Sequence, residues 1–475
     1  MAVGTQLAFE QYRDQTKYCT KEPAEMNPIT KIFKQQEKRA VRALKSNSFN
    51  TIRNLITQEK FTQTIQSKLP KHRRRLYSPI ETLSMFVSQA LSQDGSCQKV
   101  VNESAMSDIN RSVSTGGYCR ARTRLSEDMV SQLAKAVASH NEQRVKSSWL
   151  WKGKKVYLVD GTTLAMPDTP ANQDAFPQTS ALCQGLGFPI CRIVGIVSLS
   201  SGSLINAAVS PYHGKGACEQ VLLRSLLSTF KCGDVVLADA FYSTYFLIEH
   251  MIANGIDIVF AQHGARKRVS NFDTGISLGK ADHLITLTKP KKPDWMREED
   301  YDLKADVIKI RELKTGGKIL ITTMLNPKRY PLKVIGELYK QRWQIEVDLR
   351  NIKSTLGLKT LHCKSPQMAI KELWVYFLAY NLIRSIMLAS ALYCSILPRM
   401  LSFKHTLQLL FAYSAIEASS SCLLKLIGKK YIGHRTGRIE PRAIKKRHND
   451  FPLLMKPRNI AREEIKLNGH PKKLK

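Results

Sequence analysis

The sequence predicts an α/β fold whose central strands run parallel, and three observations lead to that prediction. Residues 156–159 and 235–238 are short runs of uncharged strand-forming residues, which is typical of strands buried on both faces of a parallel sheet. Each run is followed directly by an aspartate, Asp160 or Asp239. Helical patterns alternate with strand patterns around them. A carboxylate at the carboxyl end of such a strand lies where open α/β sheets place ligand sites, although a single aspartate there is also a common helix cap or turn residue.

Residues 1–148 are predicted to form a helical N-terminal region. The segment SPIE at 78–81 combines a capping box with a proline at the first helical position, so a helix is expected to begin there. Further helices are expected at about residues 98–106 and 118–140. A basic cluster at residues 71–75 precedes them. These patterns alone do not distinguish a bundle that binds a polyanion from a plain solvated bundle.

Residues 149–358 are predicted to form the α/β core. The first strand is followed by a predicted hairpin whose turn is rich in serine and glycine. Beyond the first strand the expected elements are strands at 190–198 and 204–209, a helix at 220–230, a strand at 235–238, a helix at 244–253 and a strand at 256–261. This order is that of a ribonuclease-H-like core, although a fold alone does not determine function.

A β-rich insertion is expected to interrupt this core at about residues 263–326. Strand patterns at 284–288, 307–313 and 319–324 are separated there by glycines and prolines. After the insertion, residues 339–353 contain no proline or glycine and carry helically spaced apolar residues, so they are expected to form a helix.

Residues 359–475 are predicted to form a helical C-terminal region with a basic tail. Within it, residues 374–398 are apolar enough to be weighed as a membrane span. Asn381 and Arg384 lie near the centre of this stretch, where either side chain would be costly in lipid. The prediction is therefore a buried helix in a protein that does not enter a membrane.

The composition predicts a polyanionic partner. The chain has 475 residues, and 73 lysines and arginines against 39 aspartates and glutamates give a formal net charge of +34. Each phosphate that such a surface neutralises releases counterions, so nucleic acid is an expected partner, although ribosomal and membrane-surface proteins share this property. The ten cysteines are scattered without a C-x-x-C pair, which argues against zinc knuckles and for reduced thiols in a cytosol. The N-terminus has no signal-peptide pattern, so a cytoplasmic location is expected.

Four residues of the segment 339–353 have the spacing of a chemical site. At about 100° per residue, Tyr339, Arg342, Glu346 and Lys353 fall within an arc of about 60° on one helix face. A carboxylate there can hold a metal ion, and the cations beside it can hold phosphate oxygens. The alternative is an ordinary surface pair, because Arg342 and Glu346 are spaced i,i+4, an arrangement worth only a few tenths of a kcal/mol.

Glu346 and the two strand-end aspartates together make a candidate triad of carboxylates. Asp160 and Asp239 occupy matching places after the two buried runs. Hard oxygen ligands of this kind suit Mg²⁺, with Mn²⁺ as a substitute, and do not suit zinc. We therefore predict that these three carboxylates are catalytic and bind the metal.

These motifs resemble those of DDE transposases from bacterial insertion sequences, in particular the insertion-sequence-four family. The spacing Tyr-x2-Arg-x3-Glu-x6-Lys resembles the YREK signature of that family. VDGTTLAMPDTPAN at 159–172 and LADAFYST at 237–244 resemble its two aspartate blocks, and GRIEPRAIKKR at 437–447 resembles its C-terminal basic block. The resemblance covers about residues 80–460 in the expected order.

The resemblance implies phosphoryl transfer with two metal ions at this site. Asp160 would contact both ions, and Asp239 and Glu346 would each complete one. Arg342 and Lys353 would neutralise phosphates near the cleaved DNA end.

Two aromatic residues complete the site that the resemblance implies. Tyr339 would hydrogen-bond a phosphate of the complementary strand. Trp295, in the insertion, is a candidate platform for a base flipped out of the DNA end, with an ordinary structural tryptophan as the alternative. The helical region at 1–148 would grip the DNA ends, and the basic tail would contact DNA as well.

The function that the resemblance implies is that of a cut-and-paste DNA transposase. Such an enzyme cleaves at the inverted-repeat ends of its element and joins the 3′ ends to target DNA. Two copies would act as a homodimer in a synaptic complex, in the bacterial cytoplasm and in association with the nucleoid. The residues alone leave two other functions open: a structure-selective DNA nuclease on the same core, and a non-catalytic DNA-binding protein.

Overall fold

The computed structural model describes most of the chain between residues 76 and 469. The described residues are 76–92, 94–107, 112–180, 185–214, 216–267, 270–415, 419–432 and 456–469, together with the single residues Gln63 and Ser67. The basic cluster at 71–75, the helical pattern before it, the basic block at 437–447 and most of the basic tail lie outside the described residues.

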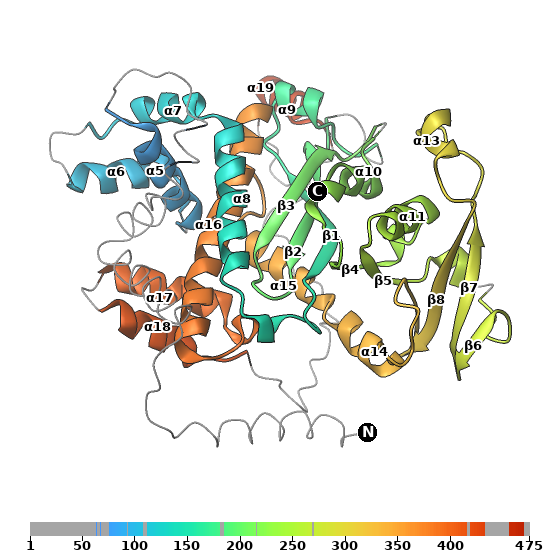
Figure 1. Ribbon diagram of the computed structural model, residues 1–475. Coiled ribbons are helices and arrows are strands. Elements are labelled where there is room, and N and C mark those ends of the chain that lie inside the picture. Colours follow the sequence, from blue (N-terminus) through green and yellow to red (C-terminus); the bar gives the residue numbers. More distant parts are fainter. Residues whose placement is uncertain are drawn as a thin grey trace, which may run out of the picture.

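A nine-stranded mixed sheet runs through the described part of the chain, in the order β3-β2-β1-β4-β5-β9-β8-β7-β6 (Figure 1). Its strands are β1 (Val156–Ala165), β2 (Ile190–Ser198), β3 (Leu204–Pro211), β4 (Val235–Ala238), β5 (Asp257–Ala261), β6 (Ile276–Gly279), β7 (Asp282–Thr288), β8 (Val307–Thr315) and β9 (Lys318–Thr322). β1, β4 and β5 are parallel to one another, whereas β2 and β3 continue from β1 as an antiparallel hairpin. The expectation of buried parallel strands is confirmed for the centre of the sheet only.

The strands of the insertion belong to this same sheet. β9 pairs antiparallel with β5, and β8, β7 and β6 follow in antiparallel order. The strands expected at 284–288, 307–313 and 319–324 correspond to β7, β8 and β9. The insertion therefore widens the sheet, and two short helices, α12 (Gly264–Lys267) and α13 (Glu298–Asp302), lie within it.

Both faces of the central strands are covered. Along β1, Val156 and Leu158 belong to one hydrophobic cluster, and Tyr157 and Val159 belong to another. Side chains alternate between the two faces of a strand, so a run that is apolar at every position has a core on each side. This explains why residues 156–159 lack the alternation of a half-exposed strand.

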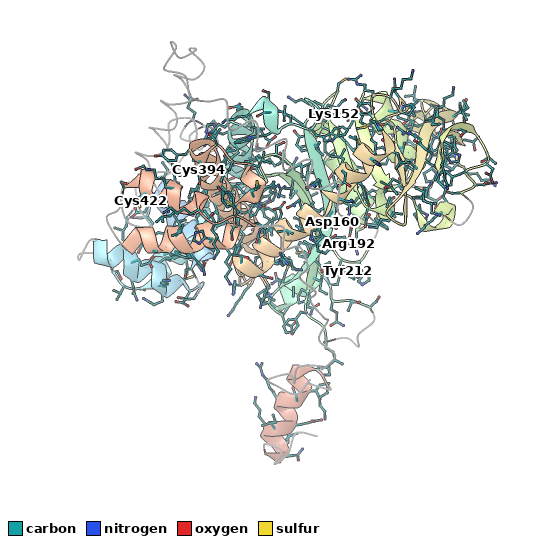
Figure 2. The ribbon with its side chains drawn as sticks, turned by 90° about the horizontal axis from the view of Figure 1, so that it is seen from below. Lys152, Asp160, Arg192, Tyr212, Cys394 and Cys422 are labelled. Carbon is teal, nitrogen blue, oxygen red and sulfur yellow. The ribbon has the colours of Figure 1, made fainter. Side chains whose placement is uncertain are left out.

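Helices cover both faces of the sheet at its centre, and others lie outside it (Figure 1). They are α5 (Pro79–Leu91), α6 (Cys97–Ser107), α7 (Thr115–Arg124), α8 (Glu127–Gln143), α9 (Pro170–Ala175), α10 (Glu219–Ser225), α11 (Tyr245–Ala253), α14 (Leu332–Lys340), α15 (Trp343–Arg350), α16 (Pro366–Cys394), α17 (Phe403–Ala415), α18 (Ser420–Gly428) and α19 (Arg458–Asn468). Figure 2 places Asp160 between Cys422 of α18 at one end and the strands of the insertion at the other. α10 and α11 contribute to the second cluster, on the face opposite α8 and α16.

The N-terminal helices begin and end at recognisable caps. The Ser78 hydroxyl accepts a hydrogen bond from the Glu81 N–H at 3.3 Å, with Pro79 at the first helical position, so α5 begins where the sequence predicted. The prediction of a single helix at 118–140 is wrong, because the structure has two helices there. Leu125 is extended, and the Ser126 side chain caps the start of α8, which ends the first helix and begins a second.

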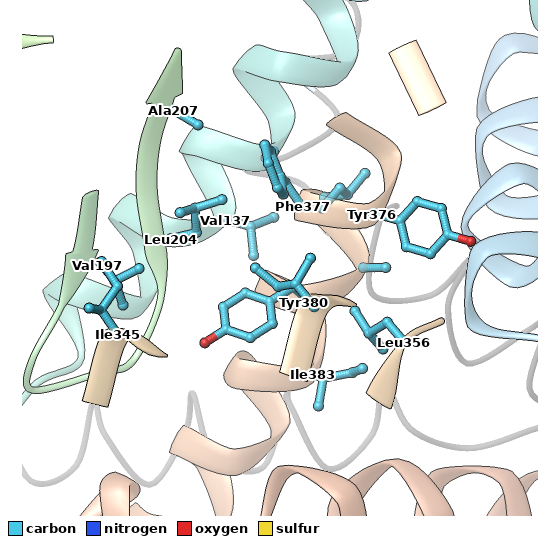
Figure 3. Packing of buried hydrophobic residues seen from close by; sticks show 14 of the residues in the cluster. Val137, Val197, Leu204, Ala207, Ile345, Leu356, Tyr376, Phe377, Tyr380 and Ile383 are labelled. Atoms are coloured by element: carbon cyan, nitrogen blue, oxygen red, sulfur yellow. The ribbon is translucent and has the colours of Figure 1, made fainter. Parts of the chain in front are cut away.

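α16 is a core helix. It is, among the described residues, the one helix long and apolar enough to cross a membrane, yet 89% of its most apolar window is buried inside the protein. The Asn381 amide exchanges hydrogen bonds with the backbone of Leu204 on β3 at 2.9 Å and donates to the Ala134 carbonyl on α8 at 3.0 Å. Figure 3 shows Phe377 and Tyr380 of α16 packed among side chains of α8 and β3. The prediction of a buried helix is confirmed.

Candidate active site

Asp160 and Asp239 lie level with each other on neighbouring strands. The parallel pairing of β1 with β4 ends at Leu158 opposite Leu237, and each aspartate follows two residues later. The backbone of Asp239 is still extended, and the charge of Asp239 acts on the Asp160 carboxyl, so the two side chains lie near each other. Neighbouring strands lie about 4.8 Å apart, which brings the two carboxylates to one edge of the sheet.

Each aspartate is held by a hydrogen bond from the backbone that follows it. Asp160 Oδ1 accepts from the Gly161 N–H at 2.8 Å. Asp239 Oδ1 accepts from the Phe241 N–H at 2.9 Å and caps a short 3₁₀ turn, Ala240–Tyr242. Asp239 is thus also a cap, as a lone strand-end aspartate often is. These bonds fix the orientation of each carboxylate.

The segment 339–353 is not one continuous helix. α14 ends at Lys340, α15 begins at Trp343, and a π-helical turn, Asn351–Thr355, follows. The N–H groups of Gln341 and Arg342 donate to carbonyls three residues back, at 3.0 Å each, so the chain tightens there. The prediction of one continuous helix over residues 339–353 is therefore wrong in detail.

The interruption does not separate Tyr339 from the site, because its side chain hydrogen-bonds that of Arg342 and interacts with the charge of Asp239. Tyr339 lies in the hydrophobic core and is only 7% exposed. Lys353 lies in the π-helical turn, where its Nζ donates to Thr162 Oγ1 at 3.2 Å and to the Thr163 carbonyl at 3.0 Å. Thr162 and Thr163 follow Asp160 along β1, so the ammonium of Lys353 lies against the part of this strand that comes after Asp160.

Arg342 links two of the predicted carboxylates. Its Nη2 lies 2.6 Å from Glu346 Oε1, and its Nη1 lies 3.7 Å from Asp160 Oδ2. The Arg342 side chain is 14% exposed, so this cation is largely withdrawn from water. The predicted i,i+4 pair of Arg342 with Glu346 is present. Arg342 also lies beside Asp160 on β1, and this further contact distinguishes the pair from an ordinary surface pair.

The electrostatics of Asp160 reflect its surroundings. Burial raises the pKa of the Asp160 carboxyl to about 6, and the negative charges of Asp239 and Glu219 contribute in the same direction. The Gly161 N–H and the Arg342 guanidinium lower this pKa and so oppose the shift. Asp160, Asp239 and Glu219 therefore share one electrostatic environment, in which positive charge is favourable.

Trp295 lies in the insertion and is 51% exposed. Its ring meets Phe246 of α11 edge-on, with 6.0 Å between ring centroids, and the guanidinium carbon of Arg224 lies 3.9 Å from its centroid. Arg224 belongs to α10. The tryptophan is thus held against the helices on one face of the sheet and keeps an exposed side, which a stacking role requires.

Glu219 is a residue of this site that the sequence analysis missed. It is the first residue of α10, and its Oε2 accepts a hydrogen bond from the Tyr242 hydroxyl at 3.1 Å. Burial raises the pKa of Tyr242 well above its usual value, and Glu219 and Asp160 add to the shift. No spacing in the sequence connects Glu219 to either aspartate. The one local signal is Gly161, a glycine in the middle of a strand.

The chemistry of the carboxylates fits a hard divalent cation. Within the residues that the structure describes, no three His, Cys, Asp or Glu side chains stand close enough together to hold a metal ion. Arg342 supplies the positive charge between Asp160 and Glu346. Asp160, Asp239 and Glu346 have the donor atoms that such an ion prefers, and they are the candidate ligands.

Comparison with known proteins gives consistent matches. Residues 151–382 match a protein family described as "Transposase DDE domain". The chain is 28% identical over 332 residues to the transposase InsG for insertion sequence element IS4 of Escherichia coli (strain K12), which covers 67% of this chain and 72% of that protein. It is 30% identical over 151 residues to the putative transposase InsZ of the same strain, covering 31% of this chain and 47% of the relative. A transposase for insertion sequence element IS421 of Escherichia coli is 32% identical over 73 residues, 15% of this chain and 19% of the relative.

Proposed function

The chain belongs to the DDE transposases of the insertion-sequence-four family, and we propose that it moves its element by a cut-and-paste pathway. Its family makes it a metal-dependent enzyme that cleaves DNA and transfers strands. In the proposed pathway it cleaves at the inverted-repeat ends and joins the freed 3′ ends to target DNA.

Three carboxylates carry the chemistry in this proposal. Asp160 would hold two divalent cations, and Asp239 and Glu346 would each complete one, with Mg²⁺ as the ion and Mn²⁺ as a substitute. Such ions supply Lewis-acid stabilisation of the attacking and leaving oxygens of a phosphodiester. The observation that carries the assignment is the level register of Asp160 and Asp239, with Glu346 joined to Asp160 through Arg342.

Cationic side chains would position the DNA backbone. Arg342 lies beside Asp160 and Glu346, and we propose that its guanidinium turns to a phosphate near the scissile bond when divalent cations neutralise these carboxylates. Its planar group suits a bidentate grip on phosphate. Lys353, whose Nζ contacts Thr162 and Thr163 of β1 from the π-helical turn, would neutralise a neighbouring phosphate.

The two aromatic residues have different exposure, which limits their proposed roles. Trp295 would stack on a base extruded from the DNA end, and its half-exposed ring supports this role. Tyr339 would contact a phosphate of the complementary strand, and only the small exposed part of its side chain could do so.

The strand order supports a ribonuclease-H-like core for residues 149–358. The hairpin β1-β2-β3 is antiparallel, and β4 and β5 follow parallel to β1 on its other side. In this proposal residues 1–148 bind DNA, residues 263–326 are the insertion into the core, and residues 359–475 form the C-terminal region. The proposal extends to a homodimer on paired ends, in the cytoplasm and at the nucleoid.

A strand-transfer assay tests this function. The purified full-length chain is incubated with a DNA duplex that ends in the inverted repeat of its element, a target plasmid and Mg²⁺, and the joined product is measured. A transposase forms covalent products that join the repeat end to the target, and no such products form in EDTA. Cleavage without joining would show a nuclease, and binding without either reaction would show a DNA-binding protein.

A further inference from the structure

The ladder between β1 and β4 ends before it reaches the aspartates. Its last paired residues are Leu158 and Leu237, two residues before Asp160 and Asp239. Asp160 is still paired with β2, on the other side of β1. Asp239 begins the 3₁₀ turn Ala240–Tyr242. The separation of the two carboxylates therefore depends on contacts outside the β1–β4 ladder.

The first residue of α10 bridges the two strand ends. A Cβ built on Gly161 would fall on the carboxylate of Glu219, so this carboxylate lies against β1 one residue after Asp160. Side chains alternate along a strand, which puts Glu219 on the face of β1 opposite the Asp160 side chain. Its Oε2 accepts a hydrogen bond from the buried Tyr242 hydroxyl at 3.1 Å. Glu219 thus joins the end of β1 to the turn that Asp239 begins.

The second residue of α10 holds the same turn. Gln220 donates from its Nε2 to the Phe241 carbonyl at 2.7 Å. The N–H of Phe241 donates to Asp239 Oδ1 at 2.9 Å. The backbone of Phe241 is therefore held by α10 through its carbonyl, and it holds the aspartate through its N–H. A shift of this turn relative to α10 would change the position of the Asp239 carboxylate.

We propose that Glu219 and Gln220 are positioning residues that, with the Tyr242 hydroxyl, set the separation of Asp160 and Asp239. The inference rests on the proposed function, because this separation matters only if the two carboxylates hold metal ions in common. Glu219 acts from the opposite face of β1 and is not a metal ligand in this proposal. The ligands of a divalent cation must lie within a few tenths of an ångström of their preferred distance, so small shifts of the aspartates weaken binding.

A purely structural role for these hydrogen bonds makes a different prediction. If they only stabilise the fold, their loss lowers the melting temperature and leaves the Mg²⁺ requirement of cleavage unchanged. If they position the aspartates, their loss raises the Mg²⁺ concentration that gives half-maximal cleavage, and saturating Mg²⁺ restores much of the rate. The two roles therefore differ in a quantity that a change in stability alone does not alter.

Cleavage measured across a range of Mg²⁺ concentrations distinguishes the two roles. The substrate is a DNA duplex that ends in the inverted repeat, and the enzyme is the full-length protein. Tyr242→Phe and Gln220→Ala are each expected to raise the half-saturating Mg²⁺ concentration by about tenfold or more, as the loss of outer contacts at a metal site commonly does. An unchanged half-saturating concentration in both variants would overturn the inference, and so would a loss of cleavage that no Mg²⁺ concentration relieves.

Ser390→Ala is the matched control for these variants. Its buried hydroxyl donates to the Leu424 carbonyl at 2.8 Å, between α16 and α18. The variant loses a buried hydrogen bond, as Tyr242→Phe does, and should have a lower melting temperature. Its half-saturating Mg²⁺ concentration should equal that of the parent protein.

Two substitutions of Glu219 test whether its hydrogen bond or its charge is needed. Glu219→Gln keeps an acceptor oxygen for Tyr242 and nearly the same volume over Gly161, so its Mg²⁺ requirement should stay close to that of the parent protein. Glu219→Ala removes the acceptor and should raise the half-saturating Mg²⁺ concentration as Tyr242→Phe does. Equal shifts in Glu219→Gln and Glu219→Ala would overturn the inference, because the charge of Glu219 and not its hydrogen bond would then be what matters.

Failure of the proposed function would give a different result. If the parent protein does not cleave the duplex, or cleaves it equally well in EDTA, the metal-dependent function itself is wrong. If the parent protein requires Mg²⁺ and neither Tyr242→Phe nor Gln220→Ala requires more of it, the proposed function stands and only the positioning role fails.

Discussion

Arg384 of α16 forms a buried ion pair with Asp348 of α15. Asp348 is completely buried, and its other oxygen lies 2.6 Å from Arg399. Asp348 comes two residues after Glu346, so about 200° of helix rotation separates the two side chains. One face of α15 is thus tied to the core helix, and the opposite face carries Glu346 toward Asp160. The ion pair fixes the rotation of α15 and with it the position of the candidate catalytic glutamate.

Breaking this ion pair should destabilise the protein. Asp348→Ala leaves two arginines without their buried partner, and such a change typically costs about 3–5 kcal/mol. The free energy of unfolding is measured by urea titration. Asp300→Ala, which removes an exposed ion pair with Arg297, is the control and should change stability little. A loss for Asp348→Ala no larger than that of the control would show that α15 is held by other contacts.

The candidate triad should be required for chemistry and not for DNA binding. Asp160→Ala, Asp239→Ala and Glu346→Ala are each expected to abolish cleavage and joining while binding to the DNA ends persists. Asp168→Ala, on the exposed loop after β1, is the control and should remain active. Cleavage and gel-shift assays on the same preparations measure both properties. Substantial Mg²⁺-dependent cleavage by a variant would remove that residue from the site.

Arg342 should exchange a structural role for a functional one when metal is added. In EDTA, Arg342→Ala leaves Asp160 and Glu346 without their counter-charge and should lower the free energy of unfolding by about 1–3 kcal/mol. Added Mg²⁺ should reduce this loss, yet strand transfer should remain at least about tenfold impaired. Arg342→Lys should restore transfer only in part, since a point charge lacks the bidentate grip of guanidinium.

Two comparisons control the Arg342 experiment. Lys340→Ala removes an exposed cation of the same segment and should leave both properties nearly unchanged. Lys353→Ala should impair strand transfer by more than any change in its melting temperature explains. Normal strand transfer by both Arg342→Ala and Lys353→Ala would show that neither side chain is needed to hold a phosphate.

The raised pKa of Asp160 predicts a pH-dependent stability in the absence of metal. The pKa rises from 3.8 to about 6 on folding, so the folded protein binds the proton more tightly than the unfolded chain. Stability contributed by Asp160 therefore falls as pH rises between these two values and stays lower above them. Asp160→Asn removes this effect. In EDTA it should be more stable than the parent protein near about pH 7.5, by up to about 3 kcal/mol, and no more stable near about pH 4.

Thermal melting across this pH range checks the prediction for Asp160. Asp168→Asn, at an exposed residue of the loop after β1, is the matched control. A constant difference between Asp160→Asn and the parent protein at every pH would mean that the carboxyl of Asp160 titrates alike in the folded and unfolded states.

DNA binding should weaken steeply with salt. The net charge of +34 predicts many phosphate contacts, and neutralising Z phosphates of duplex DNA gives a slope near about −0.9Z in a plot of log affinity against log salt. Fluorescence anisotropy at several salt concentrations measures the slope. A nearly flat line would assign the basic surface to another partner.

Local sequence signals predicted the strands of the site better than its helices. The apolar runs before Asp160 and Asp239 identify buried strands because every position along them faces a core. The break at Arg342 is different, since its neighbours are all compatible with a helix. The side chain of Arg342 reaches Asp160 on β1, a tertiary contact between segments near opposite ends of the core in the sequence, which no local pattern contains.

The same reason explains why Glu219 was missed. Its contacts with Gly161 and Tyr242 join three segments that are far apart in sequence, and each residue alone is unremarkable there. The division of the predicted helix at 118–140 is a smaller failure, because Ser126 is a recognisable cap residue in the sequence. The roles of the triad, Arg342, Lys353, Tyr339 and Trp295 remain predictions.

The packing of α16 against α8 and β3 has a consequence for how the transposable elements that encode such proteins evolve. A single hydrophobic cluster includes Leu83 of α5, Leu158 of β1 and Ile427 of α18, so the N-terminal and C-terminal helices complete the interior beneath the strands that carry the aspartates. A recombination event that exchanged only the DNA encoding residues 149–358 between two transposable elements would leave both proteins with a mismatched interior. If the N-terminal region binds the DNA ends as proposed, it must therefore be inherited together with the catalytic strands or diversify by point mutation on its outer surface.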